Sequence, residues 1–381
     1  MNELYELPEG WEWQEWKNIV NVKNGKHYKE VLNPNGKYPI YGSGGIMNYA
    51  DEYLCNENTT IIGRKGTINS PIFVKEKFWN IDTAFGLEAK QEYLTPLYLY
   101  YFALHFDFLT LNKSTTLPSL AKSNLQKILM PLPPLQEQKR IVAKLNSLFA
   151  KIDQAITLHQ QNIDKAQGFM GSVLNEVFGE LEGKYEKRTL NDVFLIARGG
   201  SPRPIKDYIT NRSDGINWIK IGDATKGDGK YIEFTEQKIK PEGLQKSRLV
   251  EEGDFIMSNS MSFGRPYIMK TKGAIHDGWL LMREKVENID KEYFYYLLSS
   301  DYMYQQFVNK ASGTTVKNLN IDLVKSSHII LPPLNIQQKT VQYLDQLSQK
   351  TETLKQVQTQ KMESLKALKA SILDRAFRGE M

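Results

Sequence analysis

The chain contains a long internal repeat, because residues 132–184 recur as residues 331–381 in one register. Each copy begins with Leu-Pro-Pro-Leu, at Leu132 and Leu331, and closes on a phenylalanine, Phe178 or Phe377. Each copy also contains an early Gln-Lys pair, at 138–139 and at 338–339. A repeat of this length without low complexity indicates a duplicated architecture.

Inside each copy the apolar residues advance in alternating steps of three and four, which predicts the a and d positions of a coiled coil. A proline pair disfavours helix in the residues before it and can begin a helix after it. Each copy is therefore predicted to contain, in this order, the end of a strand, a turn at the prolines and a helix of roughly 45 residues. Two helices with matching seams would most simply pack on each other, and two independent surface helices are the alternative. The expected seam aligns Leu145, Leu148, Ile152, Ala155, His159, Asn162, Ala166, Phe169 and Val173 with Leu344, Leu347, Thr351, Leu354, Gln358, Lys361, Leu365, Leu368 and Ile372.

The composition describes a multidomain globular chain. It has 381 residues, 41% hydrophobic and 11% aromatic, which is ample for more than one core. Basic and acidic residues number 13 and 14 in residues 1–131, and 22 and 19 in residues 185–330, which permits nucleic-acid binding through local patches without requiring it. No apolar run is long enough to span a membrane and the first residues are not signal-like, so we expect a cytoplasmic protein.

The sequence shows no recognisable catalytic or metal site. Cys55 is the only cysteine and the five histidines are scattered, so neither a disulfide nor a metal-ligand spacing is present. No Gly-rich loop ends in Gly-Lys-Ser/Thr, and the motifs of amino-methyltransferases and of common nucleases are missing. An enzyme would therefore need a disguised site.

The globular segments 1–131 and 185–330 resemble each other at their ends and differ in their middles. The expected helix at 99–102 parallels 294–297, and a Thr-Thr pair precedes a short strand and a proline corner in both segments. These features predict two domains of one fold with different specificities. The middle part of each segment is predicted to form short strands separated by glycine-rich turns. The expected strands are 38–41, 59–62, 72–74, 218–221, 254–257 and 267–269.

Recognition residues usually lie in loops on such a rigid sheet. Arg64 and Lys65 lie between glycines directly after an apolar strand, where Arg can bond guanine edges and Lys can meet phosphate, although a solvated hairpin tip is the alternative. The turn 42–45 can offer backbone amides to phosphate or be a plain tight turn. The candidate contact residues in such turns are Ser43, Gly44, Arg64 and Lys65 in the first segment, and Arg198, Ser201, Arg203 and Arg265 in the second.

These motifs together resemble the specificity (S) subunit of type I restriction-modification enzymes. Residues 7–11, 38–45, 62–66 and 81–85 are similar to one type of target-recognition domain of that family, and residues 218–223 and 275–279 to a different type. The Leu-Pro-Pro-Leu helices resemble its conserved regions. The resemblance covers essentially the whole chain in the order domain, helix, domain, helix.

The resemblance implies an α+β fold in which two mixed α/β target-recognition domains, 1–131 and 185–330, are separated by conserved helices, 132–184 and 331–381, that pair as an antiparallel coiled coil. It also implies a DNA reader without catalysis of its own. Each domain would read one half of a bipartite, asymmetric double-stranded DNA target, and the helix pair would set the spacer and dock two methyltransferase (M) subunits. Endonuclease (R) subunits would join that core.

The resemblance implies no cofactor on this chain, with S-adenosylmethionine on the M subunits and ATP and Mg on the R subunits, and no membrane. The resemblance further implies contacts by Thr115 and Thr116 in the first domain, and by Lys220, Thr314 and Thr315 in the second. Because domains that read different sequences share the Thr-Thr pairs, we expect these threonines to bind phosphate or brace the fold rather than to discriminate bases. Lys220 can either brace the backbone beside Gly222 or contact DNA, and the sequence favours neither role. A scaffold that joins protein partners through the same helices remains the main rival, and its binding would be insensitive to salt.

Overall fold

The computed structural model describes residues 5–112, 117–224, 226, 229–259, 263–311 and 319–381. The chain divides into two compact units, of which the first contains Met1–Gln160 and Gln358–Met381 and the second contains Gln161–Val357. Each unit therefore consists of a sheet-rich domain together with stretches of the same two long helices, α4 (Leu135–Glu182) and α10 (Leu334–Phe377).

The described elements of the first domain alternate short strands with a few helices. Its strands are β1 (Glu12–Glu15), β2 (Val20–Asn24), β3 (Tyr38–Gly42), β4 (Gly45–Ala50), β5 (Thr59–Gly63), β6 (Ile72–Val74), β7 (Trp79–Asn80), β8 (Ala84–Ala89) and β9 (Leu129–Leu132). Its helices are α1 (Trp16–Ile19), α2 (Pro96–His105), η1 (Phe108–Leu111) and α3 (Lys122–Leu125).

The second domain contains the corresponding elements and further ones. Its strands are β10 (Lys187–Thr189), β11 (Phe194–Arg198), β12 (Ile209–Thr210), β13 (Ile216–Ile219), β14 (Tyr231–Ile232), β15 (Gln237–Ile239), β16 (Arg248–Val250), β17 (Phe255–Ser258), β18 (Pro266–Met269), β19 (Gly273–Ile275), β20 (Trp279–Glu284) and β21 (His328–Ile330). Its helices are α5 (Leu190–Val193), η2 (Ile205–Asp207), α6 (Ile221–Ala224), η3 (Pro241–Lys246), α7 (Lys291–Ser299), α8 (Asp301–Ala311) and α9 (Ile321–Lys325).

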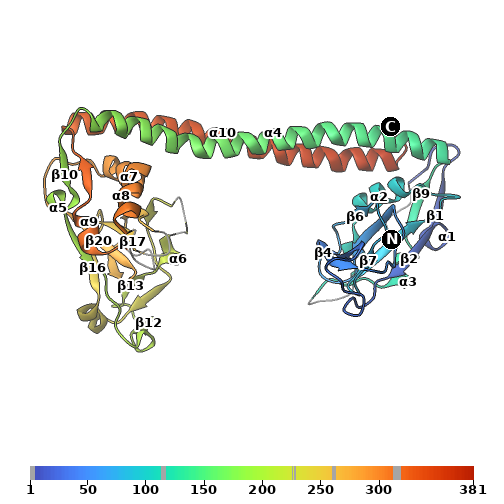
Figure 1. Ribbon diagram of the computed structural model, residues 1–381, viewed down its shortest axis with the longest axis horizontal. Helices are drawn as coiled ribbons and strands as arrows, with labels where there is room; N and C mark the ends of the chain where they lie inside the picture. Colours follow the sequence, from blue (N-terminus) through green and yellow to red (C-terminus); the bar gives the residue numbers. More distant parts are fainter. Residues whose placement is uncertain (1–4, 113–116, 225, 227–228, 260–262, 312–318) are drawn as a thin grey trace. The chain divides into compact units, whose positions relative to one another are not determined.

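Both domains are built on one frame. An antiparallel sheet has the order β2-β8-β5-β6 in the first domain, and β11-β20-β17-β18 reproduces it in the second. A second sheet contains a parallel pair in each domain, β3 with β7 and β13 with β19. The strand pairs β1-β9 and β10-β21 lead into α4 and α10 (Figure 1). The mixed α/β fold and the duplication expected from the sequence are thus confirmed.

The strands expected from the sequence form, with one correction. The segment 218–221 was expected to be extended throughout, whereas β13 ends at Ile219. Helix α6 begins at Ile221 because the Asp223 carboxylate accepts a hydrogen bond from the backbone N–H of Lys220 at 2.9 Å.

The long helices pack on each other within each unit (Figure 1). In the first unit Asp153 pairs with Lys369 at 2.7 Å, and farther along α4 His159 bonds Gln358, which lies earlier in α10. The pair is therefore antiparallel, as expected. In the second unit Val173 and Phe178 share one apolar core with Leu344.

The predicted coiled-coil seam is half correct. One column, Leu145, Ile152, His159, Ala166 and Val173, is buried or half-buried as expected. The other column is correct at Leu148, Ala155 and Leu347, which are half-buried. Farther along α4 it lies one residue later, because Ile163 and Met170 are half-buried while Asn162 and Phe169 are exposed. In α10 the half-buried residues are correspondingly Lys355, Met362 and Lys369, so Leu354 and Leu368, which were expected in the seam, are exposed.

The polar middle of the seam contains a pair of equivalent residues. When two copies of one helix pair antiparallel, only one pair of equivalent positions can lie opposite each other. Here that pair is His159 and Gln358, whose Nδ1 and Oε1 atoms are 2.5 Å apart and which are separated by 199 residues, the period of the repeat. A polar contact inside an apolar seam fixes helix register.

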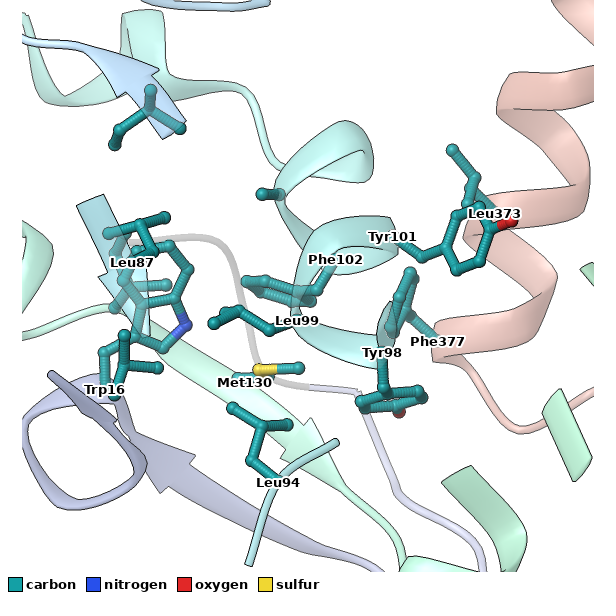
Figure 2. Close-up of a cluster of buried hydrophobic side chains, with 14 of the residues drawn as sticks. Trp16, Leu87, Leu94, Tyr98, Leu99, Tyr101, Phe102, Met130, Leu373 and Phe377 are labelled. Carbon is teal, nitrogen blue, oxygen red and sulfur yellow. The ribbon is translucent and has the colours of Figure 1, made fainter. Parts of the chain in front are cut away.

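The core of the first unit joins the domain to α10. Figure 2 shows Phe377 of that helix beside Tyr98 and Phe102 of α2, with Trp16 and Met130 in the same cluster. Phe178 holds the equivalent place in the second unit, where its ring lies 5.7 Å from that of Tyr293. Among the described residues, no helix is long and apolar enough to cross a membrane.

Candidate DNA interface

A short loop links the two sheets of each domain, and we call it the crossover loop: residues 81–83 in the first domain and 276–278 in the second. Each loop leaves the end of a parallel strand, β7 or β19, and enters β8 or β20. Because the carboxyl ends of parallel strands meet at one edge, the residues after β3 and β13 lie beside these loops. Most of the predicted contact residues gather here.

In the first domain the turn that contains Ser43 and Gly44 follows β3. The backbone N–H of Ile81 donates to the carbonyl of Tyr41 at 3.0 Å, which places this turn beside the crossover loop. Gly42 packs on the Ile81 side chain, since a Cβ atom built there would lie 3.2 Å from its Cδ1.

Arg64 approaches the same loop from the end of β5. Its backbone N–H donates to the carbonyl of Thr83 at 2.7 Å, and its Nη1 lies 3.5 Å from the carbonyl of Asp82. Its guanidinium lies 5.7 Å from the centre of the Phe85 ring. Lys65, the next residue, is exposed. Because a guanidinium has five N–H donors, these contacts orient Arg64 and leave donors for a ligand.

In the second domain three predicted residues converge on Asp277. Ser201 Oγ donates to Asp277 Oδ1 at 2.5 Å, and Arg203 Nη2 lies 3.5 Å from Oδ2. Arg198 Nε donates to the Asp277 carbonyl at 3.0 Å. The Ser201 hydroxyl lowers the pKa of the Asp277 carboxyl, so the residue is ionised at neutral pH. The cluster combines two arginines with one carboxylate and keeps a net positive charge.

Lys220 lies at the same edge, because β13 runs parallel to β19 and Ile219 pairs with Ile275. Arg265 does not join the cluster: its Nη2 donates to the Gly229 carbonyl at 3.3 Å and its guanidinium lies 5.4 Å from the Tyr267 ring. Thr115, Thr116, Thr314 and Thr315 fall outside the described residues.

The structure adds Asn259, which the sequence analysis missed. Its backbone N–H donates to the Gly278 carbonyl at 3.0 Å and its Nδ2 donates to the Asp277 carbonyl at 2.9 Å. It therefore makes, from the end of β17, the contacts that Arg64 makes from the end of β5. One position of the shared frame thus holds the crossover loop in both domains, with different side chains.

Asp277 was also missed, although it lies inside the 275–279 motif. A signal was available for both residues: Asn259 follows β17 where Arg64 follows β5, and Asp277 occupies the place of Asp82 in the order of the chain. The divergent middles hid this alignment, because the insertions between the shared strands shift the numbering.

A glycine lets β2 and β11 approach each crossover loop. A Cβ atom built on Gly25 would lie 1.8 Å from the Ile81 carbonyl oxygen, and one on Gly199 would lie 2.1 Å from that of His276. Real Cβ atoms do not come this close to a backbone oxygen. Both domains therefore require glycine at this point.

His276 makes the second crossover loop sensitive to pH. Burial lowers its pKa from 6.5, and its Nδ1 accepts a hydrogen bond from the Gly278 N–H at 2.9 Å, which requires the neutral ring. Because the pKa of His276 is lower in the folded state, the stability that its neutral ring contributes is fully present above pH 6.5. That contribution is lost as the pH falls through the folded-state pKa. We expect recognition by the second domain to weaken, as the pH falls below 6.5, more than recognition by the first.

The check is DNA binding by duplexes that carry one half-site each, measured across this range. The His276→Ile variant introduces the residue found at Ile81 and should remove the additional pH dependence. Equal pH dependence of both half-sites in the original chain would contradict the assignment.

Within the described parts of the chain, no group of His, Cys, Asp or Glu side chains is placed to hold a metal ion.

Comparison with known proteins agrees with this architecture. The family model of the type I restriction modification DNA specificity domain matches residues 8–165 and again residues 182–363. The chain therefore belongs to the family of type I restriction-modification specificity subunits, which are non-catalytic DNA-recognition components, and it contains two target-recognition domains.

Curated relatives match over most of their length. A putative type I restriction enzyme specificity subunit of Haemophilus influenzae is 25% identical over 90% of this chain and 89% of its own. The MjaVIII specificity subunit of Methanocaldococcus jannaschii is 25% identical over 98% and 94%. The EcoBI specificity subunit of Escherichia coli is 23% identical over 100% and 88%.

Solved structures share the fold. A chain from a study of complex assembly and conformational transition of the type I restriction-modification system aligns with a TM-score of 0.78 at 21% identity, over 99% of this chain and 100% of its own. The HsdS subunit from Thermoanaerobacter tengcongensis aligns with a TM-score of 0.59 at 21% identity, over 100% and 99%.

Proposed function

We propose that each domain, 1–131 and 185–330, reads one half of a bipartite, asymmetric DNA target through the edge around its crossover loop. The helices, 132–184 and 331–381, set the unread spacer and dock two M subunits, and R subunits join through that core. S-adenosylmethionine then belongs to the M subunits, and ATP and Mg to the R subunits. The complex works in the cytoplasm on double-stranded DNA.

The observation that carries this proposal is the shared frame around the crossover loops. Arg64 and Asn259 hold the loops in the same way, while the side chains exposed around them differ between the domains. A common support with different exposed residues is what two readers of different half-sites require. We propose Ser43, Gly44, Arg64 and Lys65 as contacts in the first domain.

In the second domain we propose contacts by the residues around Asp277 and by Lys220, with Arg265 as a separate contact. Arginines suit base edges, and the smaller polar groups suit phosphate. The Thr-Thr pairs at 115–116 and 314–315 remain proposed phosphate contacts. Phosphate contacts predict that log affinity falls linearly with log salt, by about 0.9 per phosphate neutralised, whereas a protein scaffold would show little salt dependence.

The direct test is methylome sequencing of cells that express this chain with its M subunit. We expect one split motif, methylated on adenine, with two unlike halves around an unread spacer. A continuous palindromic motif would contradict the proposal. Insertions or deletions in the helix pair should change the preferred spacer before they change either half-site.

Docking of two M subunits is supported by exposed apolar residues on the helices. Leu158 and Val357 occupy equivalent positions of the repeat and are both exposed. Phe169 and Leu368 form a second equivalent pair, each 47% exposed. Scattered apolar residues on a surface need no explanation, but recurrence at equivalent positions of both copies provides two equivalent surfaces.

We expect Phe169→Ser and Leu368→Ser each to weaken one of two M contacts by about tenfold, as for an apolar contact of moderate size. The double variant should lose both contacts. Native mass spectrometry of the complexes gives the stoichiometry, and Tyr343→Ser, at an exposed position whose equivalent is Lys144, is the control. Full M occupancy of the double variant would exclude these residues from docking.

A further inference from the structure

A buried glutamine joins each domain to the first turn of the helix that follows it. Gln138 of α4 is fully buried; its Oε1 accepts from the Thr95 N–H at 2.8 Å, and its Nε2 donates to the carbonyls of Tyr93 and Pro133 at 2.8 and 2.9 Å. Thr95 is the residue directly before α2. The amide thus ties the start of α4 to the start of α2.

Gln337 of α10 makes the same connection in the second unit. Its Oε1 accepts from the Asp290 N–H at 2.8 Å, and its Nε2 donates to the Pro332 carbonyl at 2.8 Å. Asp290 directly precedes α7, the counterpart of α2. The residue equivalent to Gln138 is therefore Gln337, and not Gln338 of the shared Gln-Lys pair, which is exposed.

Two tyrosines of α2 and two of α7 add equivalent hydrogen bonds. Tyr98 donates to the Pro131 carbonyl at 3.1 Å, and Tyr293 donates to that of Ile330 at 3.0 Å. One turn later, Tyr101 donates to Asn146 in the first unit.

Tyr296 donates to Asp345 Oδ1 at 2.6 Å in the second unit, which is the counterpart of the Tyr101 contact. Burial raises the pKa of Tyr101 to about 12 and also raises that of Tyr296, so both hydroxyls stay protonated donors. Each domain is thus fixed to its helix at two points, the buried glutamine and the second tyrosine. The first tyrosine fixes α2 or α7 to the strand that leads into that helix, so the three contacts together define an orientation.

Burial alone does not explain glutamine at these positions, because leucine or methionine fills a similar volume without a polar group to satisfy. A buried amide that is hydrogen-bonded through both its oxygen and its nitrogen is directional and selects one arrangement of the groups around it. We infer that Gln138 and Gln337 are positioning residues that fix the orientation of each target-recognition domain on its helix and thereby restrict the spacer that the subunit accepts. This inference rests on the proposed function.

The inferred effect on the spacer follows from the dimensions of DNA. Successive base pairs are only about 3.4 Å apart along the axis, so a small rotation of a domain at this junction brings a neighbouring spacing within reach. The recognition edge of the domain itself is unchanged by such a rotation. Loosening the junction should therefore broaden spacer tolerance while half-site preference is kept.

The experiment measures methylation rates of the complete M-S complex on duplexes with the cognate target, with the spacer one base pair shorter or longer, and with a base changed in one half-site. We expect Gln138→Leu and Gln337→Leu each to reduce discrimination against the altered spacers by about tenfold, the factor for losing roughly one net hydrogen bond. Discrimination against the altered half-site should stay within about twofold.

Gln136→Leu and Gln338→Leu are matched controls, because both glutamines are exposed in the same first turns. Tyr101→Phe and Tyr296→Phe remove one hydroxyl each and should give the same change with smaller size, which keeps the test valid if a leucine variant does not fold. Unchanged spacer discrimination in folded variants, or equal loss of spacer and half-site discrimination, overturns the inference. If the original complex shows no split target, the proposed function itself fails.

Discussion

Replacing Phe377 with alanine is expected to lower the free energy of unfolding of the first compact unit by about 3–5 kcal/mol, the usual cost for a buried phenylalanine. Although Phe377 ends the last helix of the chain, its ring is 1% exposed and lies 5.1 Å from Tyr98 and 5.3 Å from Phe102. Its carbonyl also accepts a hydrogen bond from Tyr5 at 2.7 Å. The loss should appear in the domain at the opposite end of the sequence.

Hydrogen exchange, resolved by peptide, measures this effect: protection should fall in α2 and stay unchanged in α7. Phe178→Ala should give the converse, because Phe178 packs on Tyr293, while Phe169→Ala should be nearly neutral because that ring is exposed. The pKa of His105, which burial lowers and whose ring stacks on Phe377, should rise toward 6.5 in Phe377→Ala. Loss of protection in α7 instead of α2 would contradict the assignment.

Replacing Gly199 with alanine is expected to abolish recognition of the second half-site and to leave the first intact. The new Cβ atom would meet the His276 carbonyl oxygen at 2.1 Å, so the crossover loop must move and carry Asp277 with it. Overpacking of this kind costs about 1–3 kcal/mol of stability and more where backbone is involved. The displaced carboxylate can no longer hold Ser201 at the edge.

Competition binding with duplexes that carry one half-site each distinguishes the two domains. Gly25→Ala should show the reverse selectivity, since its Cβ atom would meet the Ile81 carbonyl. Gly168→Ala is the control: nothing lies within 4 Å of a Cβ there, and alanine in a helix interior is favoured by about 1 kcal/mol. If Gly199→Ala still binds both half-site duplexes, the crossover loop does not position the residues that contact DNA.

Several features of the molecule could be predicted from the sequence because they are local or repeated. The Leu-Pro-Pro-Leu corners, the long helices and the strands β3, β5, β6, β17 and β18 follow from proline geometry, periodicity and glycine punctuation. Arg64 and Arg198 were both candidate contact residues, and both lie at a crossover loop. Each of these signals lies within a few residues along the chain.

The second column of the seam could not be predicted in the same way. Steps of three and four fit Phe169 as well as Met170, and only the packing of α4 against α10 decides that Met170 turns inward. A shift of one residue moves a side chain by about 100° around a helix, which separates the seam from the exposed surface. Phe169 and Leu368 thereby changed from core residues to proposed docking residues.

The sequence by itself determined the duplication, the element types and the class of protein, because these depend on composition, spacing and order. Only the tertiary structure decided which residues meet: Phe377 with the first domain, Asn259 in the place of Arg64, and Gln138 at the start of α2. These contacts join segments far apart in the chain, and insertions of different length in the two domains conceal the correspondence. Three-dimensional proximity, rather than any local pattern, therefore defines the candidate interface and the junctions that position it.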